Sequence, residues 1–173
     1  MPTVFTHAVV GVAISTLGRP ASARLGLAAA ACAAVPDLDV IPIWLGLPWG
    51  HVLGHRGITH SLAFAAALAG VLAATVFRAP GAGRRGVWLV LFVATASHGV
   101  LDAMTDGGIG IAFFAPFDDG RYFLPWRPIP VSPISVGRFF GARGAAVLRA
   151  EVLLLWLPAF LMALVAVWRR RRR

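Results

Sequence analysis

Charged residues are scarce in this chain. They make up 13% of its 173 residues, whereas 58% of the residues are hydrophobic. A soluble domain of this length usually has about a quarter of its residues charged. A water-soluble core of this size could not enclose so much apolar surface, so the composition excludes an ordinary soluble domain and indicates a membrane protein.

Cysteine is nearly absent as well. Cys32 is the only one and lies in an alanine-rich apolar run. The chain therefore cannot form an internal disulfide, and it has no CxxC pattern for a thiolate metal site. We interpret Cys32 as a small packing residue.

Lysine is missing altogether, and the 16 basic residues are all arginine and leave a net charge of +9. Such a balance often indicates nucleic-acid binding. Here, however, the arginines form short clusters between apolar runs instead of one stripe, as topology signals of membrane proteins do. We therefore expect membrane lipid as a partner and no nucleic acid.

Apolar runs predict an all-α polytopic membrane bundle of about four to five helices in a single domain, residues 1–173. Only the last three runs approach the ~20 residues that an upright span needs. The first two could form a helical hairpin inside the bundle or dip in without crossing. The expected helices are residues 4–17, 25–35, 61–77, 86–101 and 152–168, with a long outer loop at 107–149 and a basic tail at 169–173.

The basic clusters predict the orientation of the bundle. If the runs cross alternately, the clusters Arg19/Arg24, Arg78/Arg84/Arg85 and 169–173 all fall on one side, which should be the cytoplasm. Six other arginines fall on the opposite side, so the bias is real but not absolute. We therefore predict a multi-pass protein of the inner or plasma membrane with a cytoplasmic C-terminus.

The N-terminus resembles a signal peptide in part. Residues 4–18 are apolar and are followed by the small residues Ala21, Ser22 and Ala23. No basic residue precedes the run, however, and His7 interrupts it, so retention of this helix is favoured.

Histidines and aspartates gather on the predicted non-cytoplasmic side of the bundle. His98 and Asp102 are four residues apart and so share a helix face, where an imidazole and a carboxylate form a natural pair of metal ligands. Ionisable groups at membrane depth are costly and usually functional. The candidate metal ligands are His7, Asp37, Asp39, His55, His60, His98 and Asp102.

Structural alternatives exist for each of these residues. Asp37 or Asp39 could cap a turn after a proline. His55 could face lipid headgroups, and His60 could satisfy a helix terminus. His98 and Asp102 could form a hydrogen-bonded pair without a metal. His51, in a polar connection, favours a solvated side chain over a ligand.

The predicted outer loop is rich in proline and aromatic residues, especially at 113–117 and 121–133. Proline excludes a regular helix there. The loop could be a lid that caps the bundle, or a lipid-facing entrance in which Arg121 or Arg127 pairs with phosphate. The sequence leaves both interpretations open.

Several motifs together resemble the YdjM-like family, described as LexA-regulated, membrane-bound, metal-dependent hydrolases. The resemblance covers roughly residues 1 to 135. It rests on His7, Pro-Asp-Leu-Asp at 36–39, His-Arg-Gly-Ile-Thr-His-Ser at 55–61, Ser-His-Gly-Val-Leu-Asp at 97–102 with Thr105, and residues 121–130.

That family is in turn similar to zinc-dependent phospholipase C and the fungal zinc nucleases, which are helical. This likeness implies that His7 matches an early histidine ligand, and that His98 and Asp102 match a ligand pair in which Asp102 bridges two metals. Asp37 or Asp39 would match an aspartate ligand, and His60 or His55 a further histidine. The chain lacks the N-terminal tryptophan ligand and a clear counterpart of a later glutamate, since Glu151 enters the last helix. One or two metal ions are therefore expected.

The resulting hypothesis is a metal-dependent hydrolase that acts on a lipid or phosphoester at the membrane interface. Zinc suits histidine and carboxylate ligands, and would activate a bound water. Arg56 could steady a developing anion, while Thr59, Thr105 and Asp106 would support the ligands. The alternatives are a metal or proton carrier without enzymatic activity, and a structural membrane protein stapled by metal. A carrier needs ionisable groups through the membrane depth, and the cytoplasmic halves of the predicted helices have none.

Overall fold

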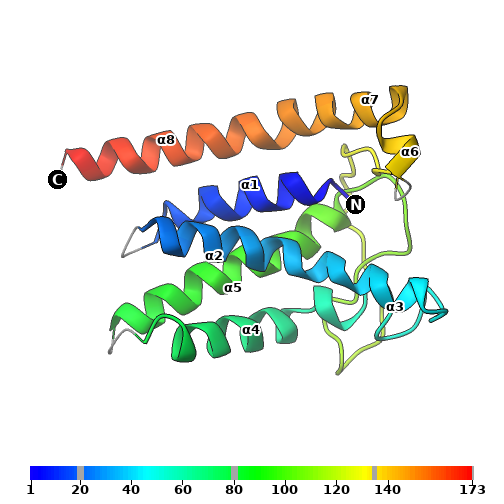
Figure 1. Ribbon diagram of the computed structural model, residues 1–173, viewed down its shortest axis with the longest axis horizontal. Coiled ribbons are helices and arrows are strands. Elements are labelled where there is room, and N and C mark those ends of the chain that lie inside the picture. Colours follow the sequence, from blue (N-terminus) through cyan, green and yellow to red (C-terminus); the bar gives the residue numbers. More distant parts are fainter. Residues whose placement is uncertain (19–21, 79–81, 134–135, 173) are drawn as a thin grey trace.

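The computed structural model describes residues 1–18, 22–78, 82–133 and 136–172, and within these ranges it contains helices and no β-strand. Figure 1 shows the long helices running side by side along the longest axis, with the N-terminus at one end of the bundle and the C-terminus at the other. Arg19, Ala21 and Arg173, which the sequence analysis used, lie outside the described residues. The predicted all-α fold is confirmed.

The first two helices pack closely because their contact is built from small residues. Helix α1 (Val4–Ser15) begins at the N-cap Thr3, and α2 (Ala23–Ala34) begins at the N-cap Ser22; each cap's hydroxyl accepts a hydrogen bond from a backbone amide three residues on. A β-carbon on Gly11 would lie 2.5 Å from the carbonyl oxygen of Ala29. Glycine at this position therefore lets the two backbones approach, as in small-residue contacts of membrane helices.

The sequence had predicted that the second helical stretch ends at residue 35. In the structure it continues beyond helix α2. A 3₁₀ turn (Val35–Asp39) and the short helix α3 (Val40–Trp44) continue it, so that Ala23–Trp44 is long and apolar enough to cross a membrane. Pro36 is tolerated because it occupies the first turn of the 3₁₀ segment, where its missing amide is not needed. The second stretch is thus longer than predicted.

The third and fourth runs form a helical hairpin. Helix α4 (Leu62–Thr75) has 14 residues and is too short for an upright span, contrary to the prediction, because Ser61 caps its start and Val76 caps its end. Helix α5 (Ala82–Ala103) is long enough to cross. The indole of Trp88 donates to the carbonyl of Ala66 and ties α5 to α4.

The loop that follows α5 ends earlier in the structure than the predicted residue 149. Helices α6 (Val136–Phe139) and α7 (Ala142–Glu151) occupy the last part of the predicted loop, and α7 continues through a π-helical turn (Val152–Trp156) into α8 (Leu157–Arg171). The final helix therefore begins ten residues earlier than the predicted 152 and includes most of the basic tail. The missed segment is polar but contains alanine, leucine and arginine, which favour helix once the prolines end.

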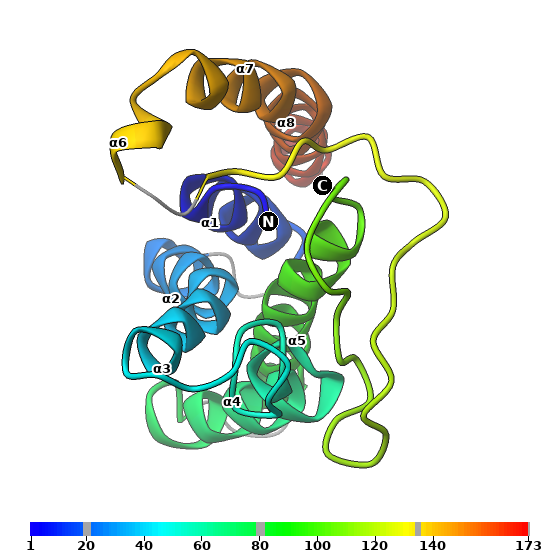
Figure 2. The ribbon, with the colours of Figure 1, turned by 90° about the vertical axis from the view of Figure 1, so that its right-hand side faces the viewer.

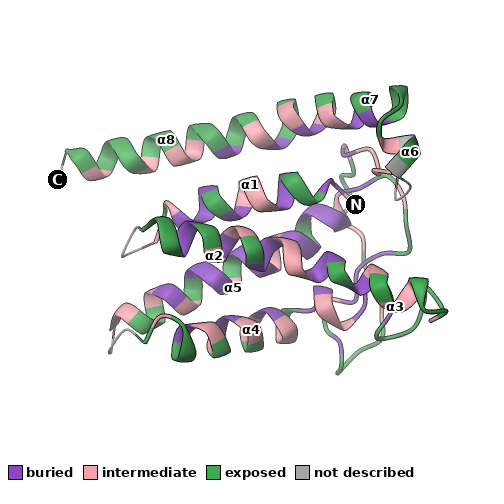
Figure 3. Ribbon diagram, in the orientation of Figure 1, coloured by how far each residue is buried: buried purple, intermediate pink, exposed green. Residues whose placement is uncertain are grey.

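The hydrophobic core lies between α1, α2, α4 and α5. Its buried members are Ile14, Leu25, Ala29, Cys32, Ala69, Ala73, Val87, Val90, Leu91 and Ala94. Cys32 is thus a packing residue, as predicted. The long α7–α8 segment lies along α1 and exposes most of its surface (Figures 2 and 3), as expected of a helix with lipid as its main neighbour.

Candidate metal centre

All seven predicted metal ligands lie together at the end of the bundle that carries the N-terminus. His7 comes from α1, Asp37 and Asp39 from the turn after α2, and His98 and Asp102 from α5; the connection before α4 supplies His55 and His60. Each of these residues is buried, with at most 9% of its surface exposed. Helices distant in the sequence therefore converge on one enclosed polar pocket.

Local sequence features place these groups. His98 and Asp102 lie one turn apart on α5, as their spacing predicts. Between them, Gly99 lets the His60 segment approach the helix, because a β-carbon there would lie 2.9 Å from the carbonyl oxygen of His60. The four-residue spacing and the glycine together bring His60 against α5.

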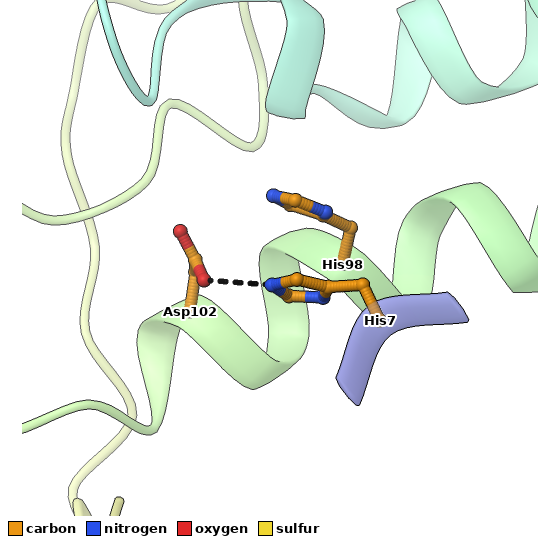
Figure 4. Close-up of side chains that lie close together, drawn as sticks. All are labelled: His7, His98 and Asp102. Carbon is orange, nitrogen blue, oxygen red and sulfur yellow. Dashed lines mark ion pairs between the residues drawn. The ribbon is translucent and has the colours of Figure 1, made fainter. Parts of the chain in front are cut away.

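His7, His98 and Asp102 form the deepest group (Figure 4). The rings of His7 and His98 are stacked with their centroids 3.7 Å apart, and His7 Nε2 lies 3.4 Å from Asp102 Oδ1. One potential ligand atom from each of the three residues lies within 4.8 Å of the others. A second group with the same property consists of Asp37, His55 and His60. The pocket thus offers two adjacent sets of three possible ligands.

Asp39 is the carboxylate that orients its neighbours. His55 Nδ1 lies 2.6 Å from Oδ1, and His60 Nδ1 lies 3.1 Å from Oδ2. The Thr59 hydroxyl and the backbone amide of Arg56 also donate to Oδ2, at 2.8 and 3.0 Å. A carboxylate that accepts this many hydrogen bonds is well placed to fix ligands and poorly placed to bind a metal itself.

The hydrogen bonds of two histidines determine which nitrogen is free. His98 Nδ1 lies 2.7 Å from the carbonyl oxygen of Ala33, which can only accept, so Nδ1 carries the proton. His60 Nδ1 faces Asp39 and carries a proton for the same reason. The two Nε2 atoms then face each other at 3.0 Å. Neutral imidazoles would repel in this arrangement, so a proton or a metal cation must lie between them.

Several buried polar atoms have no hydrogen-bond partner among the described residues: both ring nitrogens of His7 and both carboxylate oxygens of Asp37 and of Asp102. Such orphaned groups are costly unless a ligand satisfies them. Two ligand atoms of one tetrahedral zinc ion lie about 3.3 Å apart. The separations within the pocket are similar: His98 Nε2–Asp37 Oδ1 is 3.4 Å and His60 Nε2–Asp102 Oδ2 is 3.6 Å. These are long for hydrogen bonds and suited to neighbouring ligands, so the donor set fits a divalent metal.

The carboxylates attract positive charge into the pocket. Burial disfavours the charged form of His60, but Asp102 and Asp39 outweigh it and raise its pKa to about 9. A cation is therefore favoured where the Nε2 atoms meet.

Arg56 lies at the rim and is 2% exposed. Its Nε is 3.3 Å from Asp102 Oδ2, and its terminal nitrogens donate to the carbonyl of Gly107 and the hydroxyl of Thr105. A β-carbon on Gly108 would collide with this guanidinium, and the positive φ of 100° at Gly108 also requires glycine. Arg56 thus spans the gap between Asp102 and the segment after α5.

The remaining predicted residues take different positions. Thr59 contacts both Asp39 and His60, whereas Asp106 is exposed and accepts a hydrogen bond from the backbone amide of Val131. The structure therefore brings Thr59 and Thr105 to the pocket and leaves Asp106 outside it. His51 is exposed and also outside it, as expected.

Two residues near the centre have roles that the sequence analysis did not foresee. The guanidinium of Arg121 donates to the backbone carbonyls of Gly50, His51, His55 and Arg56, and so shapes the loop that presents His55. Glu151 is fully buried against the start of α1. An isolated glutamate at the start of an apolar helix was the available signal, because such a group needs partners.

Comparisons with known proteins agree with a membrane protein. The sequence model of a family described as YdjM inner membrane protein matches residues 1–173. Inner membrane protein YbcI of Escherichia coli (strain K12) is 39% identical over 173 residues, which are 99% of this chain and 100% of the relative. No solved structure matches the chain.

Proposed function

The chain belongs to the family of YdjM inner membrane proteins, and from this premise we propose that it is a metal-dependent hydrolase with one or two zinc ions at its polar end. The observation that carries the proposal is the set of buried, unpartnered atoms on His7, Asp37 and Asp102, which lie at ligand-to-ligand distances from one another or from the Nε2 atoms of His60 and His98.

The residues divide into ligands and supports in this proposal. His7, His98 and Asp102 would hold one ion, and Asp37, His55 and His60 would hold a second ion if two bind. His60 and Asp37 also lie close enough to Asp102 and His98 to complete the first site when a single ion binds. Asp39 and Thr59 orient His55 and His60, and Arg56 holds Asp102. Orienting groups of this kind raise both the affinity and the precision of a metal site.

The chemistry would be hydrolysis of a phosphoester. A bound zinc ion supplies a water of lowered pKa and polarises a phosphoryl oxygen. The protein supplies the surroundings: a cavity of about 80 Å³ beside His55 and Arg56, walled by Trp49, Ile109 and Val131, opens next to the pocket. Given that a water molecule takes up roughly 30 Å³, this cavity has room for a phosphoryl-sized group.

The location favours a lipid as substrate. The pocket lies at the end of apolar helices, and exposed aromatic side chains surround that end: Trp44, Trp49, Phe117 and Trp126. Aromatic residues of this kind anchor proteins at the headgroup level of a bilayer. A substrate whose apolar part stays in the membrane could present its phosphoester to the cavity.

A metal or proton carrier is less well supported. Between the pocket and the arginine-bearing end of the bundle, the buried polar side chains of the described residues are uncharged, namely Ser15 and Thr95. The hydroxyl of each donates to a carbonyl of its own helix. A conduit would need ionisable or hydrated groups through that depth.

Metal analysis of the detergent-purified protein tests the first half of the proposal. We expect bound zinc in the wild type, a loss of more than tenfold in affinity for His98→Ala, and no change for His51→Ala, whose exposed ring lies outside the pocket. Unchanged metal content in His98→Ala would overturn the metal centre.

Release of a phosphorylated headgroup from phospholipid in mixed micelles tests the second half. Asp102→Asn should abolish chelator-sensitive hydrolysis while the protein remains folded. If the metal-loaded wild type cleaves neither phosphomonoester nor phosphodiester lipids, the hydrolase assignment fails even though metal is bound. If Asp102→Asn does not fold, the structural staple is favoured over the enzyme.

A further inference from the structure

Glu151 is the chain's only glutamate and is fully buried where α7 meets the π-helical turn. Its Oε1 accepts a hydrogen bond of 2.6 Å from the backbone amide of Thr3. Its Oε2 accepts hydrogen bonds from the hydroxyls of Thr3 and Thr6, at 2.6 and 2.7 Å. No basic side chain pairs with it among the described residues. A buried carboxylate is costly, so these three short bonds must offset its desolvation.

The partners of Glu151 form the N-terminus of α1. Thr3 is the N-cap of that helix, and Thr6 lies in its first turn. The amides at a helix N-terminus lack partners within the helix, and the helix dipole favours negative charge there. The first turn of α1 contains no acidic residue. Glu151 thus supplies, from another helix, the negative charge and the hydrogen-bond acceptors for this N-terminus.

The same turn carries His7 into the metal centre. The backbone amide of His7 donates to the carbonyl of Thr3, so the position of Thr3 sets the position of His7. Neither ring nitrogen of His7 has a hydrogen bond among the described residues. Its imidazole is therefore placed by the position of α1, by stacking on His98 and by the 3.4 Å contact of Nε2 with Asp102, and no hydrogen bond to its ring fixes it.

A local distortion of the last helix completes the contact. The π-helical turn Val152–Trp156 follows Glu151 directly, and the indole of Trp156 donates to the hydroxyl of Thr6 at 2.7 Å. A π turn shifts the register of the residues that follow, and such turns often occur at functional sites. Here both Glu151 and Trp156 face Thr6.

The last helix also holds the other end of α1. Arg170 donates to the carbonyls of Thr16 and Gly18, which follow the last turn of α1. A carboxylate at the N-terminus and a guanidinium at the C-terminus both complement the helix dipole of α1. Between these ends, an open cavity of about 320 Å³ lies between α1 and α8 and is lined by apolar residues such as Val9, Val12 and Phe160. The polar contacts described here therefore hold α1 at its two termini.

We propose that Glu151 is a positioning residue of the metal centre: by fixing the N-terminus of α1, it sets the place of His7 among the other ligands. The inference rests on the proposed metal binding. It predicts that Glu151 affects metal affinity and ligand geometry through His7 and through no other ligand.

A double-mutant cycle tests this in the detergent-purified full chain loaded with Co²⁺, with affinity measured by chelator competition and ligand geometry by visible absorption. We expect Glu151→Ala to weaken binding about 10–100-fold, as for other groups that orient ligands, and to change the spectrum toward that of His7→Ala. In the double variant the two losses should not add, because Glu151 has nothing left to position.

Two further variants separate positioning from general destabilisation. Leu68→Ala truncates a half-buried side chain on α4, away from α1; its spectrum should match the wild type, and any loss of affinity should add to that of His7→Ala. Glu151→Gln keeps an acceptor for the Thr3 amide, should lose less affinity than Glu151→Ala, and serves for the same cycle if the alanine variant does not fold.

The outcomes are distinguishable. Wild-type protein that binds no Co²⁺ overturns the proposed metal centre, and the inference with it. Wild-type protein that binds Co²⁺, while the Glu151 variants keep the affinity and spectrum of the wild type or add their full loss to that of His7→Ala, overturns the inference alone.

Discussion

The two ends of this helical bundle carry their charges in opposite ways. At the end that holds the N-terminus, aspartates, histidines and one arginine are buried together within a few ångströms. At the other end the arginines are exposed or half-buried, and those with hydrogen bonds, Arg24, Arg78 and Arg170, donate to backbone carbonyls. No carboxylate occurs at that end in the described residues.

This contrast separates two uses of charge in a membrane protein. Exposed arginines at helix ends lie at the headgroup level and determine topology at little energetic cost. Buried ionisable groups oppose folding unless they are paired. In the pocket, His7, Asp37 and Asp102 have ion-pair contacts, yet several of their polar atoms lack a hydrogen bond. Buried polar atoms that lack a hydrogen bond in a fold indicate a function outside folding, and these atoms are the basis of the proposed metal site.

The two ends should differ most in the free energy of unfolding that is lost when one arginine at each end is replaced by a neutral residue. Arg56→Gln removes a guanidinium that contacts Asp102, Gly107 and Thr105 in a buried site. Loss of one partner of a buried ion pair costs about 3–5 kcal/mol. Arg84→Gln changes an exposed residue and should stay within about 0.5 kcal/mol. Reversible unfolding in mixed detergent, with both variants beside the wild type, measures the free energy of each.

Equal free energies of unfolding for the two variants would contradict the proposed difference between buried charge at one end and exposed charge at the other. Asp102→Asn combined with Arg56→Gln gives a further check, because removing both charges leaves neither one buried alone. The double variant should recover part of the stability that Arg56→Gln loses.

A smaller effect is expected from single hydroxyl groups. Thr59→Val removes the donor to Asp39 Oδ2 and the contact with His60, and should lower metal affinity roughly tenfold while preserving side-chain shape. Thr75→Val removes a hydroxyl that bonds to its own helix at the opposite end and should leave metal binding unchanged. Chelator competition on both variants measures this, and a similar loss in both would argue against an oriented His60.

Much of the fold was predictable because long apolar runs carry a strong signal in a membrane protein. The gathering of the histidines at one end of the bundle is confirmed, although Arg56 and Arg121 also lie at that end. The side that faces the cytoplasm stays a prediction. The errors have local causes. Pro36 reads as a helix stop, yet the first turn of a 3₁₀ segment tolerates it. The segment Ala142–Glu151 is too polar to read as part of a spanning helix, although its backbone is helical.

The composition of the pocket was also predictable, whereas the division of labour within it was not. A Pro-Asp-Leu-Asp turn offers two equivalent aspartates to a reader of the sequence. Only the structure shows that Asp39 is occupied by donors and Asp37 is not. The role of Glu151 could not be predicted because its partners lie 148 and 145 residues away. The distant likeness to zinc-dependent phospholipases stays a prediction.

The smallest effect on metal affinity is expected from exposed residues at the same end as the pocket. It shows whether burial of a residue, and not its position at that end, determines how much its mutation changes metal binding. Asp118 and Tyr122 lie in the segment after α5 and are both exposed, and the Tyr122 hydroxyl donates to Asp118 Oδ2 at 2.6 Å. This hydrogen bond raises the pKa of Tyr122 above its ordinary value, while it and the amide of Gly120 lower the pKa of Asp118. The phenol should therefore ionise at higher pH in the folded protein than in the unfolded chain.

Asp118→Ala should return the Tyr122 pKa toward its ordinary value, and Asp119→Ala should not. Ultraviolet absorbance of the tyrosinate reads this directly, because the chain has a single tyrosine. Water screens the contact, so metal affinity should be the same in both variants and in the wild type. A large loss of metal binding in Asp118→Ala would mean that exposed charges at this end also support the pocket, and that burial alone does not define the centre.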